Sequence, residues 1–397
     1  MVCTRDIPVA PENGREKALR FAYNAIAEEA NIEIQRLHSV LEERRLPRML
    51  SMLWAAVSSL IARRPLPMQT LLFHDDSTLH RLIDAVERLR PVAVYFDGVR
   101  SGACIPALRK RFPSLRIVCD FDDLMSRRTG LLAEGGHPIS MGYLSSRVPH
   151  WAKQHVLDGS IARLVLSYER RALENLESRI QRGADAIVLV SSVDAAHFAL
   201  REPGAKIAVI PPVIGDNGTL IPCVKIERFI FIGTDSLLQN RESIEFLVDL
   251  WGRVQPAIRL EIFGKQTRSY PPTAGVEFKG FVDRVADAYM PGSVLLAPAF
   301  IGGGVKTKVL EAMSFGVTPI GTAATFEGID APTQQLCFTT AQLEEIVREP
   351  HRFESSLSEA GRAAIEVARQ SHSPRRLSRA WRRVMLLAGK ATHGDGH

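Results

Sequence analysis

Short apolar runs recur along the chain, with stretches of helical periodicity between them. The runs are continuous rather than alternating, which is typical of strands that a parallel sheet buries on both faces. In the first half we expect strands at 70–73, 92–96, 116–119, 186–190 and 207–210. In the second half we expect them at 228–232, 258–263, 276–280, 294–298 and 317–320. The pattern predicts an α/β fold with two doubly wound, Rossmann-like domains.

The stretch PPVIGDNGTLIP, residues 211–222, contains three prolines and two glycines and is typical of a linker. Residues 354–390 have a helical pattern that breaks at SHSP, residues 371–374. We therefore expect a first domain, a linker, a second domain, and a C-terminal helix that packs back on the first domain before a tail. Their ranges are 1–210, 211–225, 226–370 and 371–397.

Two such domains would face one another across a cleft lined by the C-terminal ends of their strands. Ligands bind at these strand ends in open α/β sheets. Candidate functional residues should therefore come directly after predicted strands.

The 397 residues are 46% hydrophobic and 24% charged, as in a globular protein of two domains. A net charge of +6 favours anionic partners such as nucleotides, phospholipid surfaces or nucleic acid. Aromatic residues make up 7% and do not alternate with the basic runs, which argues against a platform for single-stranded nucleic acid, and we expect no nucleic-acid partner. Five scattered cysteines without a CxxC pair suggest free thiols in a reducing compartment.

No apolar run reaches 18 residues, and the N-terminus lacks the apolar core of a signal peptide. These features predict a cytoplasmic protein, or one attached peripherally to the cytoplasmic face of a membrane. Residues 44–64 form an apolar stripe with arginines at both ends. This profile fits an interfacial helix on an anionic inner-membrane surface, and equally a helix that covers a sheet.

Residues 300–316 read FIGGGVKTKVLEAMSFG and follow a predicted strand. Glycines between a strand and a helix let backbone N–H groups approach an anion, and the helix N-terminus adds partial positive charge. The glycines are Gly302, Gly303 and Gly304. Lys306 and Lys308 supply full charges for a diphosphate. Glu311, one turn into the helix, suits a ribose diol.

A Walker P-loop requires a glycine immediately before its lysine, and Val305 stands there instead. The alternative is a structural one, in which Lys308 and Glu311 pair at i, i+3 on a solvated helix face.

The motifs of the second half occur in a fixed order: RFIFIGTDSLLQNRESIEFL, LEIFGK, VEFKGFVD, and the glycine–lysine stretch that continues to TFEGI. Over residues 226–330 this order resembles the C-terminal half of GT-B glycosyltransferases, particularly the retaining family 4, or group 1, enzymes. The resemblance implies that the glycine element holds the diphosphate and sugar of a donor and that Glu311 holds its ribose. The segment 279–283, which includes Gly280, would border the base.

The resemblance also places Arg241 and Lys265 near the diphosphate. A surface pair with Glu245 is the alternative for Arg241, and a simple loop cation is the alternative for Lys265. Many family members carry a second glutamate eight residues before the first, where this chain has Gly303.

The opening TRDIPVAPENGREKALRF resembles the first loop and helix of the family, with a preceding strand that is short or missing. Gly14 and Arg15 would contact an acceptor or the donor phosphate, or simply form a tight turn. Asp97 follows a strand and could act as a general base, which an inverting enzyme needs and a retaining one does not. A structural turn with Arg100 is the alternative for Asp97.

Three aspartates, Asp120, Asp122 and Asp123, lie at the end of another predicted strand. An Asp-x-Asp pattern can ligate a divalent metal. Because metal is usually dispensable in the GT-B fold, we expect these side chains to cap a helix or border the acceptor cleft.

Together these features predict a hexosyltransferase that moves a sugar from a UDP- or GDP-type donor to a saccharide or lipid-linked saccharide acceptor in bacterial surface polysaccharide synthesis. No cofactor beyond the donor and no metal is expected. Lys306, Lys308 and Arg241 would stabilise the leaving diphosphate. The alternatives are a nucleotide-sugar epimerase of the same fold and a non-catalytic basic adaptor for a membrane or nucleic acid.

Overall fold

The computed structural model describes residues 1–9, 14–39, 65–73, 76–135, 160–215 and 225–385, together with positions 54, 57–59 and 61. The chain divides into two compact units. Unit 1 comprises Met1–Ile210 with Leu377–His397, and unit 2 comprises Pro211–Arg376. Unit 2 thus extends beyond residue 370, where the sequence suggested that the second domain ends.

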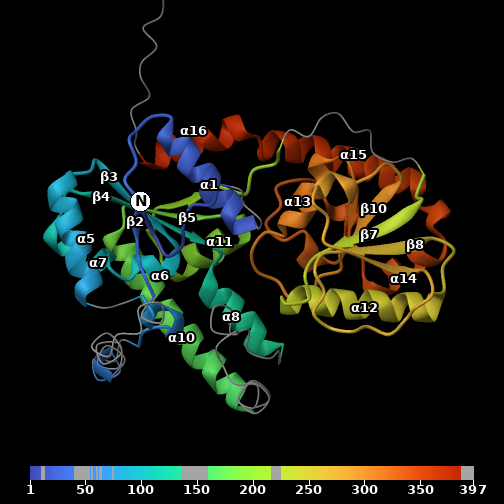
Figure 1. Ribbon diagram of the computed structural model, residues 1–397, viewed down its shortest axis with the longest axis horizontal. Helices are drawn as coiled ribbons and strands as arrows, with labels where there is room; N and C mark the ends of the chain where they lie inside the picture. The colour runs from blue at the N-terminus through green and yellow to red at the C-terminus, as the bar shows by residue number, and fades with distance from the viewer. Residues whose placement is uncertain are drawn as a thin grey trace, which may run out of the picture. The chain divides into compact units, whose positions relative to one another are not determined.

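Unit 1 contains a six-stranded parallel sheet in the order β2-β1-β3-β4-β5-β6 (Figure 1). The strands are β1 (Val2–Cys3), β2 (Gln35–Arg36), β3 (Ala93–Asp97), β4 (Arg116–Asp122), β5 (Ala186–Leu189) and β6 (Ile207–Val209). The strand order reverses between β1 and β3, so the C-terminal ends of these two strands border the point where such sheets bind ligands.

Helices cover both faces of this sheet, with α1 (Gly14–Ala27) and α16 (Pro374–Met385) on one face (Figure 1). The opposite face carries α6 (Gly98–Gly102), α7 (Ile105–Arg111) and α10 (Ser160–Gly183). The other helices in the described part of this unit are α4 (Met68–Leu71), α5 (Asp76–Leu89), α8 (Met125–Glu134) and α11 (Ser192–Arg201).

The last helix, α16, packs on unit 1 through an apolar side chain and the charged side chain next to it. Trp381 contacts Tyr95 of β3 edge to face, with 5.6 Å between the ring centroids. Arg382 pairs with Glu29 at 2.8 Å and with Glu28 at 3.2 Å, both just beyond α1. The buried aromatic pair and the charged contacts at its edge fix this C-terminal element.

Unit 2 contains a five-stranded parallel sheet in the order β11-β10-β7-β8-β9. The strands are β7 (Arg228–Ile232), β8 (Arg259–Phe263), β9 (Val276–Gly280), β10 (Ser293–Leu296) and β11 (Thr318–Ile320). Here the order reverses between β7 and β10. One face of the sheet carries α12 (Leu238–Val254) and α14 (Thr340–Arg348), and the other carries α13 (Thr307–Ser314) and α15 (Glu354–Ser371) (Figure 1).

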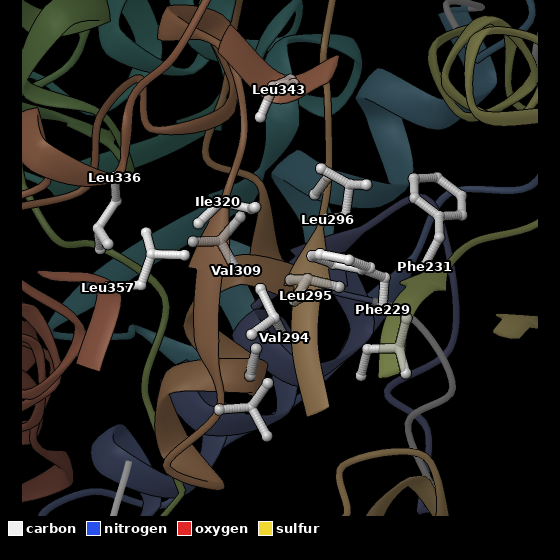
Figure 2. Packing of buried hydrophobic residues seen from close by; sticks show 14 of the residues in the cluster. Phe229, Phe231, Val294, Leu295, Leu296, Val309, Ile320, Leu336, Leu343 and Leu357 are labelled. Carbon is white, nitrogen blue, oxygen red and sulfur yellow. The ribbon is translucent and has the colours of Figure 1, made fainter. Parts of the chain in front are cut away.

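Short 3-10 turns complete unit 2 at Val285–Asp287, Ala323–Thr325, Gln334–Leu336 and Pro350–Arg352. The core of this unit joins the central strands to their covering helices (Figure 2). Phe229, Leu295 and Val309 are each fully buried in it. Helix α15 approaches β11 so closely that a Cβ atom on Gly361 would collide with Thr318, which explains a glycine inside that helix.

Nine of the ten expected strands are present, so the predicted fold class is confirmed. The strand expected at 70–73 is wrong, because these residues form the end of α4 and the turn after it. A short apolar run does not by itself distinguish a strand from a buried helical turn. Strands β1 and β2 have only two residues each, too few to give a pattern.

The amphipathic stretch 44–64 lies mostly outside the described residues. Of its apolar stripe, Trp54, Val57 and Ile61 are described, and they are exposed. Among the described helices, none has the length and apolar content needed to span a bilayer. Cys3, Cys104 and Cys119 are buried free thiols, and Cys337 is a partly buried one, as the sequence predicted.

Candidate functional site

In unit 2 the end of β7 and the end of β10 come together where the strand order reverses. Glycines after β7 and β8 make this junction tight. A Cβ atom on Gly233 would lie 2.7 Å from Cγ of Asn240, and one on Gly264, whose φ is +115°, would lie 2.5 Å from the Gly233 carbonyl oxygen. The first turns of α12, which carry Asn240, are therefore held directly against the strand ends.

A pocket opens at this junction, lined by α12, by the residues after β10 and by the start of α13. Its polar lining residues include Asn240, Ser243, Lys306, Lys308 and Thr325. Asn240 donates to the carbonyl oxygen of Thr234 at 3.0 Å, which fixes the amide and turns its oxygen toward Lys308.

Lys308 is the central cation of the pocket. Its Nζ donates to Oδ1 of Asn240 at 2.7 Å and lies 4.1 Å from the centroid of the Phe231 ring. Burial lowers the pKa of Lys308 to about 7, and repulsion from Lys306 adds to the effect. A partly buried ammonium whose contacts within the described residues are an amide oxygen and a ring favours the arrival of an anion.

Lys306 supports the glycine loop from the other side. Its side chain is largely buried, and Nζ donates to the carbonyl oxygen of Gly303 at 2.9 Å. Gly303 and Gly304 have φ of +91° and +67°, which explains glycine at both positions, and Gly302 precedes them in the loop. The backbone N–H of Gly303 donates to Oε2 of Glu327 at 3.0 Å.

Glu311 lies on α13, in the turn after Lys308. The hydroxyl of buried Tyr289 donates to its Oε2 at 3.3 Å, and the Tyr289 ring stacks on Phe315 at 5.1 Å. The same hydroxyl lies 3.3 Å from the carbonyl oxygen of Lys308. Tyr289 thus fixes both the carboxylate and the helical turn that presents it.

The other unit 2 candidates lie around the pocket rather than in it. Arg241 is partly buried on α12 next to Asn240, and Lys265 is exposed after β8. Gln266, rather than Lys265, contacts the strand ends, since its Nε2 donates to the Gly233 carbonyl oxygen at 2.9 Å. Gly280 ends β9, at the sheet edge, with φ of +71°.

Asp97 and Gly14 lie in unit 1, at the C-terminal edge of the other sheet. Asp97 ends β3 with its side chain 2% exposed, and Gly14 begins α1. The next residue, Arg15, hydrogen-bonds to Asp97 and lies 3.0 Å from Oδ2 of Asp120 and 3.2 Å from Oδ1 of Asp122. The residue that the sequence associated with a phosphate is thus the shared partner of three carboxylates.

Arg15 forms a carboxylate–arginine cluster with Asp97, Asp120 and Asp122. Burial raises the pKa of Asp122 to about 6, against the opposing charge of Arg15, and it also raises the pKa of Asp120. The hydroxyl of Tyr95 donates to Oδ2 of Asp120 at 2.7 Å. Asp122 has φ of +66° at a register shift between β4 and β5, an unusual conformation for a non-glycine residue.

Asp123, the third aspartate of the predicted triple, pairs with Arg128 at 3.1 Å instead. In the described ranges, no three metal-ligating side chains gather at one point. The carboxylate–arginine cluster, the amide of Asn240, the hydroxyl of Tyr289 and the carboxylate of Glu327 were not foreseen as partners. Only TFEGI, as part of the motif order, hinted at Glu327.

Comparison with known proteins supports the motif-based resemblance. Residues 227–349 match the family described as Glycosyl transferases group 1. No curated protein matches the chain. HepE from Anabaena, solved in complex with UDP, is similar to this chain with a TM-score of 0.60 at 10% identity, over 98% of this chain and 100% of HepE.

Two further structures are also similar. A mutant of TarM from S. aureus, solved with Fondaparinux, alpha-GlcNAc-glycerol and UDP, gives a TM-score of 0.52 at 9% identity over 78% of this chain. The alignment spans 59% of that TarM chain. Sucrose-phosphate synthase from Thermosynechococcus elongatus gives 0.51 at 14% identity, over 80% of this chain and 82% of its own. At sequence identities this low, the structural similarity shows a shared fold and nothing more specific.

Proposed function

From the GT-B fold of the chain and the match of residues 227–349 to the group 1 glycosyltransferases, we propose that the protein transfers a hexose. The donor would be a nucleoside-diphosphate sugar and the acceptor a hydroxyl group of a saccharide. The pocket at the end of β7 and β10 would hold the diphosphate of the donor.

The observation that carries this proposal is the lowered pKa of Lys308, which lines the pocket. An ammonium with a pKa lowered to about 7 gains most from a partner that brings negative charge into the same low-dielectric site. The pocket also contains Lys306 and adjoins the N-terminal end of α13, which begins at Thr307. Two cations and a helix N-terminus form a site for linked phosphates rather than for a neutral ligand.

With the diphosphate in this pocket, the neighbouring residues can be assigned to the other parts of the donor. Glu311, held by Tyr289 on the same helix as Lys308, would accept the two hydroxyl groups of the ribose. The residues that end β9, including Gly280, would border the base. Arg241 and Lys265 would add positive charge around the diphosphate. UDP is the nucleotide bound in HepE, which makes a UDP-type donor the first choice over a GDP-type one.

Catalysis would come mainly from stabilising the departing diphosphate by Lys306, Lys308 and the backbone N–H groups of the loop. Transfer with retention needs no dedicated side-chain base, because the leaving diphosphate can take the proton of the acceptor on the same face. The pairing of Asp97 with Arg15 fits this course, since this buried carboxylate is already engaged by a guanidinium.

A lipid-linked or growing saccharide of a bacterial surface polysaccharide is the acceptor that we propose. The net charge of +6 and the amphipathic sequence of residues 44–64 support a location of the proposed transfer at the cytoplasmic face of a membrane. TarM, whose structure contains alpha-GlcNAc-glycerol, illustrates a protein of similar fold with a sugar-bearing ligand.

Thermal-shift measurements with UDP-, GDP-, ADP- and CMP-linked sugars test the proposal. One class should stabilise the chain, by about 2.7 kcal/mol at a hundredfold excess over the dissociation constant. That stabilisation should be lost in Glu311→Ala and retained in Glu359→Ala, an exposed carboxylate on α15. An absence of protection by all four classes would refute a sugar-nucleotide site.

A further inference from the structure

A carboxylate from outside the glycine–lysine stretch reaches its loop. Glu327 lies 24 residues beyond Gly303 in the chain, yet its Oε2 accepts the Gly303 N–H at 3.0 Å. Lys306 Nζ donates to the carbonyl oxygen of the same glycine at 2.9 Å. A carboxylate and an ammonium therefore lie against one residue of the loop.

The backbone that leads to Glu327 is fixed to the end of β10. Thr322 Oγ1 donates to the carbonyl oxygen of Ala299 and accepts the Ala299 N–H at 3.1 Å. Thr325 Oγ1 donates to the carbonyl oxygen of Ala297 at 2.6 Å. Both contacts hold the 3-10 turn Ala323–Thr325 against the strand end, so Glu327 is presented by a rigid segment.

Negative charge at this position conflicts with diphosphate binding alone. A carboxylate next to a phosphate site repels the ligand unless it binds some other part of it. Glu327 is also poorly suited to occupy the phosphate position until a ligand arrives. The turn that leads to it is hydrogen-bonded to the residues after β10, so its backbone cannot move away to admit the phosphate. The position of Glu327 calls for a ligand group that donates hydrogen bonds beside the phosphates.

The hydroxyl groups of a sugar meet this requirement, since a carboxylate can accept hydrogen bonds from two of them. We propose that Glu327 binds hydroxyl groups of the transferred sugar and thereby selects the donor. This inference rests on the function proposed above and assigns one part of the donor to each group. Lys306 and Lys308 hold the diphosphate, Glu311 the ribose, and Glu327 the sugar.

Calorimetric titration of Glu327→Gln with UDP, UDP-glucose, GDP and GDP-mannose tests this assignment. Glutamine can still accept the Gly303 N–H, so the loop should keep its conformation. Loss of a charge-assisted hydrogen bond should weaken the bound sugar nucleotide by roughly 10- to 100-fold. The free nucleoside diphosphate lacks the sugar, so its affinity should change by less than about twofold.

A second substitution of Glu327 and a control substitution complete the test. Glu327→Ala should reproduce the selective loss for the sugar nucleotide. Asp330→Asn removes one negative charge from an exposed position on the same segment and should alter neither affinity. Melting temperatures of all variants report whether the loop has been disturbed.

The other outcomes are decisive. Tighter binding of free nucleotide by Glu327→Gln would show that the carboxylate competes with phosphate, and equal weakening of both ligands would show a structural role. Either result overturns the assignment. If the wild-type chain binds the nucleotides but loses no sugar-nucleotide affinity in Glu327→Gln, only the inference fails. If it binds none of the four, the proposed function fails and the role of Glu327 falls with it.

Discussion

The two units place opposite charges at equivalent positions of their sheets. In unit 1, Asp97 ends β3 beside the order reversal, and Asp97 and Asp120 of the neighbouring β4 lie buried around Arg15. In unit 2, Lys306 and Lys308 follow β10 beside the order reversal and line the pocket. Both sheets are parallel and contain a reversal of strand order, but unit 1 supplies the counter-charge for its acidic groups from its own first helix.

The C-terminal edge of a parallel sheet commonly binds ligands. The difference between the two units indicates that its chemistry depends on whether the charged side chains there are already paired within the protein. A cluster with its own counter-ion is chiefly a structural feature, because removing the shared arginine leaves buried carboxylates unpaired. A cation held by an amide oxygen and an aromatic ring, as Lys308 is, is available to a ligand.

The largest effect should come from breaking the carboxylate–arginine cluster. Arg15→Met removes the partner shared by three carboxylates and should lower the free energy of unfolding by about 3–5 kcal/mol at neutral pH. Denaturant unfolding measures the loss. Lys17→Met, an exposed change on the same helix, should stay within about 0.5 kcal/mol. A loss for Arg15→Met no greater than that of the control would contradict a structural cluster.

Removing the corresponding cation from unit 2 should instead reduce binding. Lys308→Met should weaken nucleoside diphosphate affinity by roughly 10- to 100-fold, as expected for a charge-assisted contact. The variant should also be more stable than the wild type near pH 6, because a desolvated ammonium is lost. Calorimetric titration and melting curves measure the two effects. Lys110→Met, exposed in unit 1, is the control that should change neither.

The charge of Lys308 should also make binding depend on pH. With a pKa of about 7, this lysine is charged below neutral pH, and a bound anion raises that pKa. Affinity should therefore fall by about tenfold between pH 7 and about pH 8.5, with proton uptake on binding. Calorimetry in two buffers of different ionisation enthalpy detects the proton, and Lys308→Met should abolish both effects. A flat profile in the wild type would contradict the role of Lys308.

The ligand-free chain should show the linked effect on stability. Because the folded pKa of Lys308 lies below the ordinary value of 10.5, the unfolded chain binds the additional proton between about pH 7 and that value. The contribution of Lys308 to stability should therefore increase with pH across this window. Comparing the pH slopes of wild type and Lys308→Met isolates it.

The smallest effect concerns Asp122. Its pKa is raised to about 6, so the folded chain holds a proton that the unfolded chain has released between about pH 4 and 6, and stability should fall across that range. Asp122→Asn removes this dependence and tolerates the positive φ. It should stabilise the chain by about 1 kcal/mol above pH 6, with little effect near pH 4. Asp84→Asn, exposed on α5, should show neither change.

The sequence predicted most of the fold because buried parallel strands are continuous apolar runs. It failed at residues 70–73, where a short run without context became α4 and a turn, and it could not show β1 and β2. A hydrophobic pattern identifies only elements that are long enough to show a period. A two-residue strand is defined by its pairing with neighbouring strands, which the sequence does not show.

The candidate site was predictable where it lies on one continuous stretch, as Lys306, Lys308 and Glu311 do. The groups that orient them come from distant parts of the chain. Asn240 is 68 residues from Lys308, and Glu327 is 24 residues from the glycine whose N–H it accepts. The carboxylate–arginine cluster spans 105 residues between Arg15 and Asp120. Such partners follow from tertiary structure and leave no local pattern.

The most direct test is a crystal structure of the chain with UDP or GDP, whichever protects it more in the thermal screen. We expect the diphosphate in the unit 2 pocket, with phosphate oxygens about 2.7–2.9 Å from Nζ of Lys308 and the ribose hydroxyl groups on Glu311. A nucleotide bound elsewhere, or one that leaves Lys308 on Asn240 without a phosphate contact, would contradict it.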